Sequence, residues 1–357
     1  MKLKEIDMYI TEKCNLKCEF CSICAGSNNK NELDYEYIIH LIDQAKELGV
    51  EDIHITGGEP SLHTHLVEII SYIVKNGIGT RLITNGTLLT YERLSELKKA
   101  GLEDIMFSVD GFSEFHDFVR GKGNYIRTMN CVENALKMNF NVRVNTVAWN
   151  ENLKDIVELG KMLETKGVSI YSVFLGSPVG RAEKLKHLSV ISSDGWLSFL
   201  KDMESNFKDS RMRVVVEKGY IFGKDDIFES DKLRSCHNIV NNLNYLSIRA
   251  DGNIYPCVFF SNSGNHIGNI KSDRLDSIME NLVKSDFYNY ISVIPQQCQQ
   301  CVDVNVCKGG CKGFSEMTGI FERDTRCSDS HKHIPVCPII KLSVSEGKLA
   351  ACTDDLV

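Results

Sequence analysis

Residues 8–21 read MYITEKCNLKCEFC, a short apolar strand that leads directly into Cys14, Cys18 and Cys21. Three thiolates at this CxxxCxxC spacing can hold three irons of a cubane 4Fe–4S cluster and leave the fourth iron without a protein ligand. Cysteine-ligated clusters usually take four cysteines. A trio is therefore typical of an open, catalytic metal site rather than of a closed, structural one.

A second motif, Gly57-Gly58-Glu59-Pro60, follows a predicted strand at residues 52–56. Two glycines let the backbone approach a ligand closely, and the Glu59 carboxylate can hold an ammonium group. The alternative for the cysteines is a zinc ribbon, which needs a fourth nitrogen or sulfur ligand nearby. Cys24 is the residue that would serve.

The stretch Cys14–Cys21, taken together with the Gly-Gly-Glu-Pro motif, resembles the radical S-adenosylmethionine (SAM) superfamily. The resemblance implies that the open iron chelates the amino and carboxylate groups of SAM. It also implies that an electron from the cluster cleaves SAM and releases a 5′-deoxyadenosyl radical, which abstracts hydrogen from a substrate. An electron donor of the flavodoxin or ferredoxin type is implied as a partner.

Composition and charge limit the classes of protein to which this chain can belong, and the oxygen sensitivity of a cluster with an open iron favours an anaerobic cytoplasm. A chain of 357 residues favours one large α/β unit with a second module. The net charge of −7, without a basic stripe, argues against nucleic acid as a partner. No apolar run approaches ~18 residues and no secretory signal is present, so we expect no membrane span. Fourteen cysteines in such a chain favour metal or redox chemistry over disulfides.

Strand and helix patterns alternate through the first half of the chain. The predicted strands lie near residues 4–10, 51–56, 79–84, 103–109, 141–148 and 168–175, and the predicted helices near 34–48, 64–76, 90–100, 124–139 and 151–166. Such alternation implies parallel strands with right-handed crossovers. Six units predict an α/β fold, the partial (β/α)6 barrel of the radical SAM core, whose chemistry lies at the C-terminal strand ends.

The second half of the chain is rich in cysteines. Seven of them are Cys236, Cys257, Cys298, Cys301, Cys307, Cys311 and Cys327. Between the first two, Asp251-Gly252 separates two apolar runs and predicts a two-residue hairpin turn. The cysteine spacing resembles the SPASM domain, which carries two auxiliary 4Fe–4S clusters. The resemblance thus implies three 4Fe–4S clusters, one of them SAM-binding.

We expect four regions along the chain. They are a radical SAM core at 1–185, a linking region at 186–230 with a helix near 193–207 and a strand near 211–216, a SPASM domain at 231–340, and a C-terminal tail at 341–357.

The resemblance also implies how the auxiliary clusters are held. One cluster takes the four cysteines Cys298, Cys301, Cys307 and Cys327, and the other takes Cys236, Cys257 and Cys311. Two alternatives remain for the fourth ligand of the second cluster. Cys337 or a more distant thiol closes the site, or its iron is open and binds a substrate thiolate.

A SAM pocket follows from the same resemblance. The implied contacts are Phe20 and Leu175 to adenine, Gly58 and Glu59 to the methionine amino group, and Ser108 with Arg120 to the ribose and carboxylate. Arginine suits a carboxylate because its planar fork pairs with both oxygens. The alternatives are core packing for Phe20 and a surface ion pair for Arg120. The stretch Gly180-Arg181-Ala182 also resembles SPASM enzymes, and no role is assigned to it.

The expected substrate is a peptide or protein. SPASM enzymes mostly modify peptides, and we expect an intramolecular cross-link in a ribosomally made peptide (a RiPP). Cys14 lies too close to the N-terminus for a preceding leader-binding domain, so we expect a leader to bind elsewhere on the enzyme or through a separate leader-binding protein. The runner-up is a haem-type or other small-molecule maturase. Formylglycine-type oxidation is disfavoured because that branch has an aspartate where this chain has Val258.

A hypothesis of another class is a non-catalytic iron–sulfur electron carrier. Such a carrier needs neither the Gly57–Pro60 motif nor the pair Ser108 and Arg120. The sequence indicates no residue for the catalytic base or for the quenching of the substrate radical.

Overall fold

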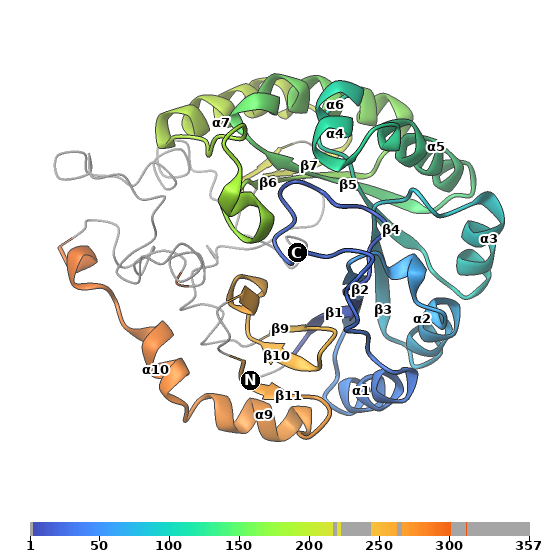
Figure 1. Cartoon of the computed structure of the whole chain (residues 1–357), viewed down its shortest axis with the longest axis vertical. Coiled ribbons are helices and arrows are strands. Elements are labelled where there is room, and N and C mark those ends of the chain that lie inside the picture. Colours follow the sequence, from blue (N-terminus) through green and yellow to red (C-terminus); the bar gives the residue numbers. More distant parts are fainter. Residues whose placement is uncertain (1–2, 217–219, 223–243, 263–265, 301–311, 313–357) are drawn as a thin grey trace.

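One curved sheet of eleven strands organises the part of the chain that the computed structural model describes, residues 3–216, 220–222, 244–262, 266–300 and 312 (Figure 1). The strand order is β11-β10-β9-β1-β2-β3-β4-β5-β6-β7-β8. The strands are β1 (Glu5–Thr11), β2 (Asp52–Gly57), β3 (Gly79–Thr84), β4 (Asp104–Ser108), β5 (Asn141–Ala148), β6 (Ile170–Leu175), β7 (Arg213–Val216), β8 (Tyr220–Phe222), β9 (Tyr245–Ile248), β10 (Asn253–Tyr255) and β11 (Gly268–Asn269).

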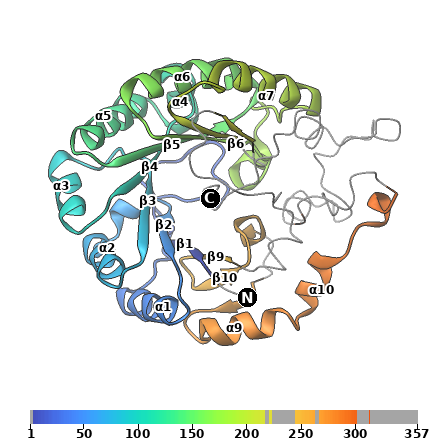
Figure 2. The same cartoon turned by 180° about the vertical axis from the view of Figure 1, so that it is seen from behind.

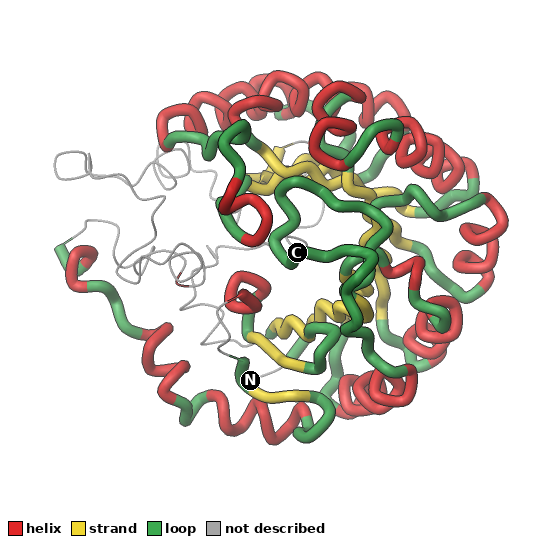
Figure 3. Tube along the Cα trace, in the orientation of Figure 1, coloured by secondary structure: helices red, strands yellow, loops and turns green. Residues whose placement is uncertain are grey.

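Helices cover the outer side of this sheet, and the strands form the inner arc (Figure 3). They are α1 (Tyr35–Glu47), α2 (Leu66–Lys75), α3 (Tyr91–Lys99), α4 (Ser113–Arg120), α5 (Asn124–Lys137), α6 (Leu153–Lys166), α7 (Ser193–Phe207), α9 (Leu275–Leu282) and α10 (Asp286–Ser292). Within the described residues, none of these helices combines the length and the apolar character that a bilayer crossing needs.

The predicted barrel is confirmed. Strands β1 to β6 pair in parallel, and both they and the five predicted helices end within two residues of the expected bounds. The predicted helix at 193–207 is α7. Helix α4 was not expected, because its eight residues carry only one short apolar repeat, Phe115 and Val119.

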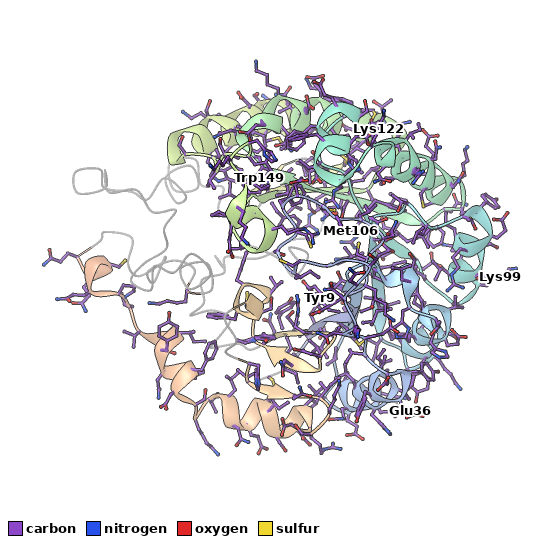
Figure 4. The ribbon with its side chains drawn as sticks, viewed as in Figure 1. Tyr9, Glu36, Lys99, Met106, Lys122 and Trp149 are labelled. Atoms are coloured by element: carbon purple, nitrogen blue, oxygen red, sulfur yellow. The ribbon has the colours of Figure 1, made fainter. Side chains whose placement is uncertain are left out.

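Alternation along β1 shows how the sheet separates its two faces. Ile6, Met8 and Ile10 are fully buried and belong to the main apolar core, together with the inward face of α1. The intervening residues therefore face the inside of the barrel, since successive strand side chains point to opposite faces. Tyr9 and Met106 lie on this inner side, whereas Lys99 lies on the outside (Figure 4).

The sheet continues beyond the six expected strands at both edges (Figure 2). β7, from the expected linking region, pairs in parallel with β6. β9, from the expected SPASM domain, pairs in parallel with β1, with Glu5 opposite Tyr245. The hairpin of the second module is therefore part of the barrel sheet, and the C-terminal end of β9, with the hairpin turn, lies at the same edge as the cysteine loop.

The predicted two-residue turn at Asp251-Gly252 is wrong. The Arg249 N–H donates to the Asn253 carbonyl over 2.9 Å, so three residues, 250–252, form the loop. Gly252 has a φ of +95°, whereas Asp251 is not among the residues with positive φ. A two-residue type I′ turn requires positive φ at both central positions, and a three-residue loop requires it only at the last.

Buried charged side chains lie on the inner face near the start of β1 and β2. His54 Nδ1 lies 3.0 Å from Asp7 Oδ1 and 3.1 Å from Glu5 Oε1. The Tyr245 hydroxyl donates to Asp7 Oδ2 over 2.7 Å. Burial lowers the pKa of His54, but the hydrogen bonds to Asp7 and Glu5 outweigh burial and raise this pKa from 6.5 to about 9. His54 is therefore a cation at neutral pH.

We expect the free energy of unfolding to fall as the pH rises through about 9. The His54 pKa is raised above its ordinary 6.5 in the fold, so its contribution is fully present below about 6.5 and is lost as the native imidazole deprotonates. The expected loss is about 3 kcal/mol. Chemical denaturation across this pH range measures it.

Two variants make this measurement specific. His54→Gln should cost about 3–5 kcal/mol, because it leaves buried carboxylates uncompensated, and should flatten the pH dependence. His40→Gln, on the exposed side of α1, should change neither. An undiminished pH dependence in His54→Gln would contradict the assignment.

Candidate functional site at the cysteine loop

The three motif cysteines lie on a loop, residues 12–26, that leaves the C-terminal end of β1; we call it the cysteine loop. Cys14 and Cys18 are buried, Cys21 is half-buried and Cys24 is exposed. The loop is packed on its own small apolar cluster, which includes Leu16 and the three motif cysteines. The structure thus brings Cys14, Cys18 and Cys21 together at the predicted edge of the barrel.

Gly57 and Gly58 let the end of β2 lie directly against this loop. A Cβ on Gly57 would be 2.3 Å from the Thr11 carbonyl oxygen, and one on Gly58 would be 2.2 Å from the Lys13 carbonyl oxygen. The Gly58 and Glu59 N–H groups donate to these two oxygens over 2.7 and 2.8 Å. The glycines are therefore needed for a backbone contact, which the sequence analysis had assigned to a ligand.

Glu59 is fully buried and anchors the next strand end. Its Oε1 accepts from the Thr84 hydroxyl over 2.7 Å and from the Ser61 N–H over 3.0 Å, while Oε2 accepts from the Asn85 N–H over 2.8 Å. A carboxylate oxygen can accept more than one hydrogen bond, so Oε2 retains capacity for the ammonium group that the sequence analysis predicts. That contact stays a prediction.

Asn85, after β3, connects Glu59 to the cysteine loop. Its side-chain amide donates to Asn15 Oδ1 over 3.0 Å and lies 4.0 Å from Cys14 Sγ. Thr87 completes the contact, because Asn15 donates to its hydroxyl over 2.8 Å. The end of β3 therefore fixes the first turn of the cysteine loop.

Arg181 holds the far side of the cysteine loop. It lies in the 3-10 helix η3 (Gly180–Lys184), and its Nε and Nη1 donate to the carbonyls of Cys18 and Ala25 over 2.7 and 2.8 Å. Its own N–H donates to the Cys21 carbonyl over 3.1 Å. Gly180 has a φ of +59°, and a Cβ there would be 2.5 Å from the Ser22 carbonyl oxygen. Three loop carbonyls thus depend on one arginine.

Arg120 forms a buried ion pair at the same edge. Its Nε donates to Asp110 Oδ2, and Asp110 Oδ1 accepts from the Val147 N–H over 2.8 Å. The Asp110 side chain is 0% and the Arg120 side chain 10% exposed. Arg120 Nη1 lies 3.9 Å from Cys18 Sγ. The alternative of a surface ion pair is therefore wrong, and the guanidinium faces the cysteine loop.

Arg120 stays protonated, and therefore positively charged, in this site. Burial lowers the pKa of the guanidinium, but Asp110 and Cys18 outweigh burial and raise it above its ordinary value. A buried ion pair loses much when one partner is removed, since the other charge is left uncompensated. Any variant at Arg120 therefore also tests Asp110.

An aromatic wall borders the site. Phe20 is half-buried and packs with Trp149, at 6.1 Å between ring centroids, and with the Arg120 guanidinium, 5.4 Å above its ring. Ser108 and Leu175 end β4 and β6 at the same edge and are half-buried. The structure places all six predicted SAM contacts along this edge, and their contacts to SAM stay predictions.

The free thiols are held protonated by their surroundings. Burial raises the pKa of Cys14 to about 12, and it also raises the pKa of Cys18. A metal centre displaces such protons because its ligand is the thiolate. Cluster binding at these cysteines is therefore expected to release protons.

The sulfurs of the cysteine loop do not converge on a single ion. Within the described residues, only Glu5, Asp7 and His54 form a group of three metal-ligand side chains with ligand atoms within 4.8 Å of one another. Sulfurs that bind one zinc ion lie about 2.3 Å from it and therefore within about 4.6 Å of one another. The fourth candidate ligand, Cys24, is exposed. The arrangement fits a larger cluster better than a zinc ribbon, and the three carboxylate and imidazole groups are explained by their ion pairs.

Two predicted ligands of the auxiliary clusters lie in the described part of the chain. Cys257 is half-buried after β10, in an apolar cluster with Tyr255 and Phe260, and Cys298 is half-buried beyond α10. The other predicted ligands lie outside the described residues, namely Cys236, Cys301, Cys307, Cys311, Cys327 and Cys337.

Comparison with known families agrees with the site. The Radical SAM superfamily model matches residues 8–163, and the SPASM model, an iron-sulfur cluster-binding domain, matches residues 236–302. A GTP 3′,8-cyclase of Aquifex aeolicus is 30% identical over 75% of this chain and 85% of its own length. The chain belongs to the radical SAM superfamily and is an enzyme of that family with a SPASM domain.

Two further relatives differ in their named products. An AdoMet-dependent heme synthase of Oleidesulfovibrio alaskensis is 27% identical over 89% of this chain and 85% of its own. A PqqA peptide cyclase of Ruegeria pomeroyi is 25% identical over 96% and 92%. The crystal structure of Streptococcus suis SuiB bound to S-adenosylmethionine matches with a TM-score of 0.71 at 20% identity, over 92% of this chain and 77% of that one, which shows a shared fold.

Membership of the two families implies iron–sulfur clusters and SAM. A bound 4Fe–4S cluster supplies the electron that cleaves SAM. The structure shows what the residues of this chain do: the strand ends hold the cysteine loop in place, and Arg120 adds a positive charge beside Cys18. Phe20 packs between Trp149 and Arg120. Asn85, Asp110 and Arg181 were not singled out individually by the sequence analysis. The signal for Asn85 and Asp110 was their place just after strands β3 and β4, and the signal for Arg181 was its place in the Gly180–Lys184 segment that follows β6.

Arg181→Gln should loosen the cysteine loop. Each hydrogen bond from a charged donor contributes about 1.5–3 kcal/mol, and the variant loses the charge on two of them. We expect the N-terminal site to lose iron faster when the protein is exposed to a chelator. The EPR signal of that site measures the rate of loss. Arg181→Lys, which keeps one donor, should be intermediate.

The control is Arg127→Gln, an exposed position on α5 with the same change in charge. It should lose iron at the native rate. Equal retention of iron in Arg181→Gln and the native protein would show that the loop does not need this arginine.

Proposed function

We propose that this radical SAM enzyme is a peptide maturase that closes an intramolecular cross-link, as in RiPP biosynthesis. The observation that carries the proposal is the end-to-end match to the PqqA peptide cyclase, which covers 96% of this chain and 92% of that one. A mycofactocin maturase of Mycolicibacterium smegmatis, 25% identical over 87% of this chain, supports the same class. A precursor peptide and a separate leader-binding protein are the partners in this proposal.

The proposed cofactor sites follow the sequence analysis. Cys14, Cys18 and Cys21 hold the SAM-binding cluster, with SAM along the edge formed by Phe20, Glu59 and Arg120. Support comes from the convergence of these residues at the C-terminal ends of β1 to β6. Two auxiliary clusters complete the set of three, and an electron donor of the flavodoxin or ferredoxin type reduces it.

A second candidate is a small-molecule maturase of the haem type. The match to the AdoMet-dependent heme synthase, at 27% identity over 89% of this chain, favours it. The two candidates share the cleavage of SAM and differ in what loses hydrogen. Substrate assays therefore separate them.

The test uses a synthetic peptide encoded by a short cysteine-rich reading frame beside the gene. Reconstituted enzyme, SAM and a reductant should convert it to a product that lacks two hydrogen atoms per cross-link, measured by mass spectrometry. The variant with Cys14, Cys18 and Cys21 all changed to Ala should leave the peptide unchanged. Consumption of a porphyrin precursor, with every candidate peptide intact, would favour the second function.

Iron content tests the proposed cluster set. Anaerobically reconstituted protein should carry about twelve irons per chain, and the triple cysteine variant about eight, because each cubane cluster holds four. Tightly bound zinc at the N-terminal cysteines would contradict the proposal.

Arg120→Lys should weaken the binding of SAM by about 1.5–3 kcal/mol, since it keeps the charge beside Asp110 and loses the planar fork. Equilibrium dialysis of the reconstituted protein measures the affinity. Arg120→Ala should lower both SAM affinity and stability, because Asp110 is then buried without a partner. Native SAM affinity in Arg120→Lys, with iron intact, would argue against a carboxylate contact.

A further inference from the structure

Arg249 is a buried cation at the edge where the second module joins the barrel. It follows β9, and hydrogen bonds at both its N–H and its carbonyl hold it in the hairpin loop. The residue is only 6% exposed. Its guanidinium carbon lies 4.6 Å from the centroid of the Tyr9 ring on β1. Arg249 is therefore fixed by backbone and by stacking, with its head on the inner side of the sheet.

The guanidinium is incompletely paired. Nη2 lies 3.4 Å from Glu12 Oε1, and the other oxygen of Glu12 accepts from Asn31 over 2.9 Å. A charge-assisted hydrogen bond is normally about 2.7–2.9 Å long, so the contact with Glu12 is weak. Nη1 is buried and has no hydrogen-bond partner among the described residues.

Arg249 lies near the cysteine loop and near the hairpin that leads to Cys257. Tyr9, which it covers, is buried on the inner side of the barrel (Figure 4). Burial raises the pKa of the Tyr9 hydroxyl, the charge of Arg249 lowers it, and Asp7, Cys21 and Cys257 raise it further. Arg249 thus lies beside the cysteine loop, to which Glu12 belongs, at the turn of the hairpin that leads to Cys257.

We propose that Arg249 binds a carboxylate of the substrate through its free Nη1 donor. A buried donor without a partner is unfavourable, and a planar guanidinium matches a carboxylate better than other acceptors. The inference rests on the proposed function in one respect: if the substrate is a peptide, the carboxylate belongs to one of its acidic side chains. If the substrate is a small molecule of the haem type, Arg249 binds the carboxylate of that small organic acid instead.

The test measures binding of small probes rather than turnover. N-acetyl-glutamyl amide, its glutaminyl twin and free glutarate are titrated calorimetrically into reconstituted protein that is saturated with SAM, so that SAM occupies its own site. We expect the glutamyl amide to bind about tenfold more tightly than the glutaminyl amide. Arg249→Gln should abolish this preference, and Arg249→Lys should retain part of it.

Two further variants sharpen the result. Glu12→Gln removes the competing carboxylate and should tighten binding of the glutamyl amide several-fold. Arg274→Gln makes the same change in charge at an arginine whose side chain is 57% exposed, and should leave binding unchanged. The iron content of each variant shows whether the clusters are intact.

The outcomes are distinct. Equal binding of the two amides to the native protein, an undiminished preference in Arg249→Gln, or loss of iron from that variant would overturn the proposal. Tighter binding of glutarate than of the glutamyl amide would uphold the carboxylate site and count against a peptide as its carrier. The inference and the proposed function thus fail by different results.

Discussion

The contact between the end of β2 and the start of the cysteine loop is the constraint on which the rest of the site depends. Gly57 and Gly58 pass so close to the Thr11 and Lys13 carbonyls that no side chain fits between them. This contact sets the direction in which the chain leaves β1. Asn85, at the end of β3, and Arg181, in the 3-10 helix that follows β6, then fix the two sides of the loop. Rigid placement of the three thiols therefore follows from backbone contacts at the end of β2 together with side-chain hydrogen bonds from Asn85 and Arg181.

Fixed charges complement this rigid loop. Arg120 and Asp110 are buried together, and the guanidinium reaches the sulfur of Cys18. Deeper in the barrel, His54 forms ion pairs with Asp7 and Glu5. The inner face of the sheet therefore carries paired charges, while the outer face carries the apolar core against the helices. This division leaves the C-terminal edge as the polar region, and all six predicted SAM contacts lie along it.

Much of the fold could be predicted from the sequence, because strand and helix periods are strong and the cysteine spacing is specific. The predicted six strands, five helices and position of the motifs at the strand ends are confirmed. Continuation of the sheet through β7 and β9 could not be predicted, since pairing between β1 and Tyr245–Ile248 joins segments far apart in the chain. The roles of Asp110 and Arg181 could not be predicted for the same reason. Their partners, Arg120 and the Cys18 carbonyl, become their neighbours only in the folded barrel.

Reductive cleavage of SAM tests the central claim most directly. Protein reconstituted without oxygen and reduced with dithionite is incubated with SAM, and 5′-deoxyadenosine is measured by chromatography. A catalytic site at the cysteine loop predicts its formation by the native protein and none by the variant that lacks Cys14, Cys18 and Cys21. Full iron content without any 5′-deoxyadenosine, or equal cleavage by the variant, would contradict the account.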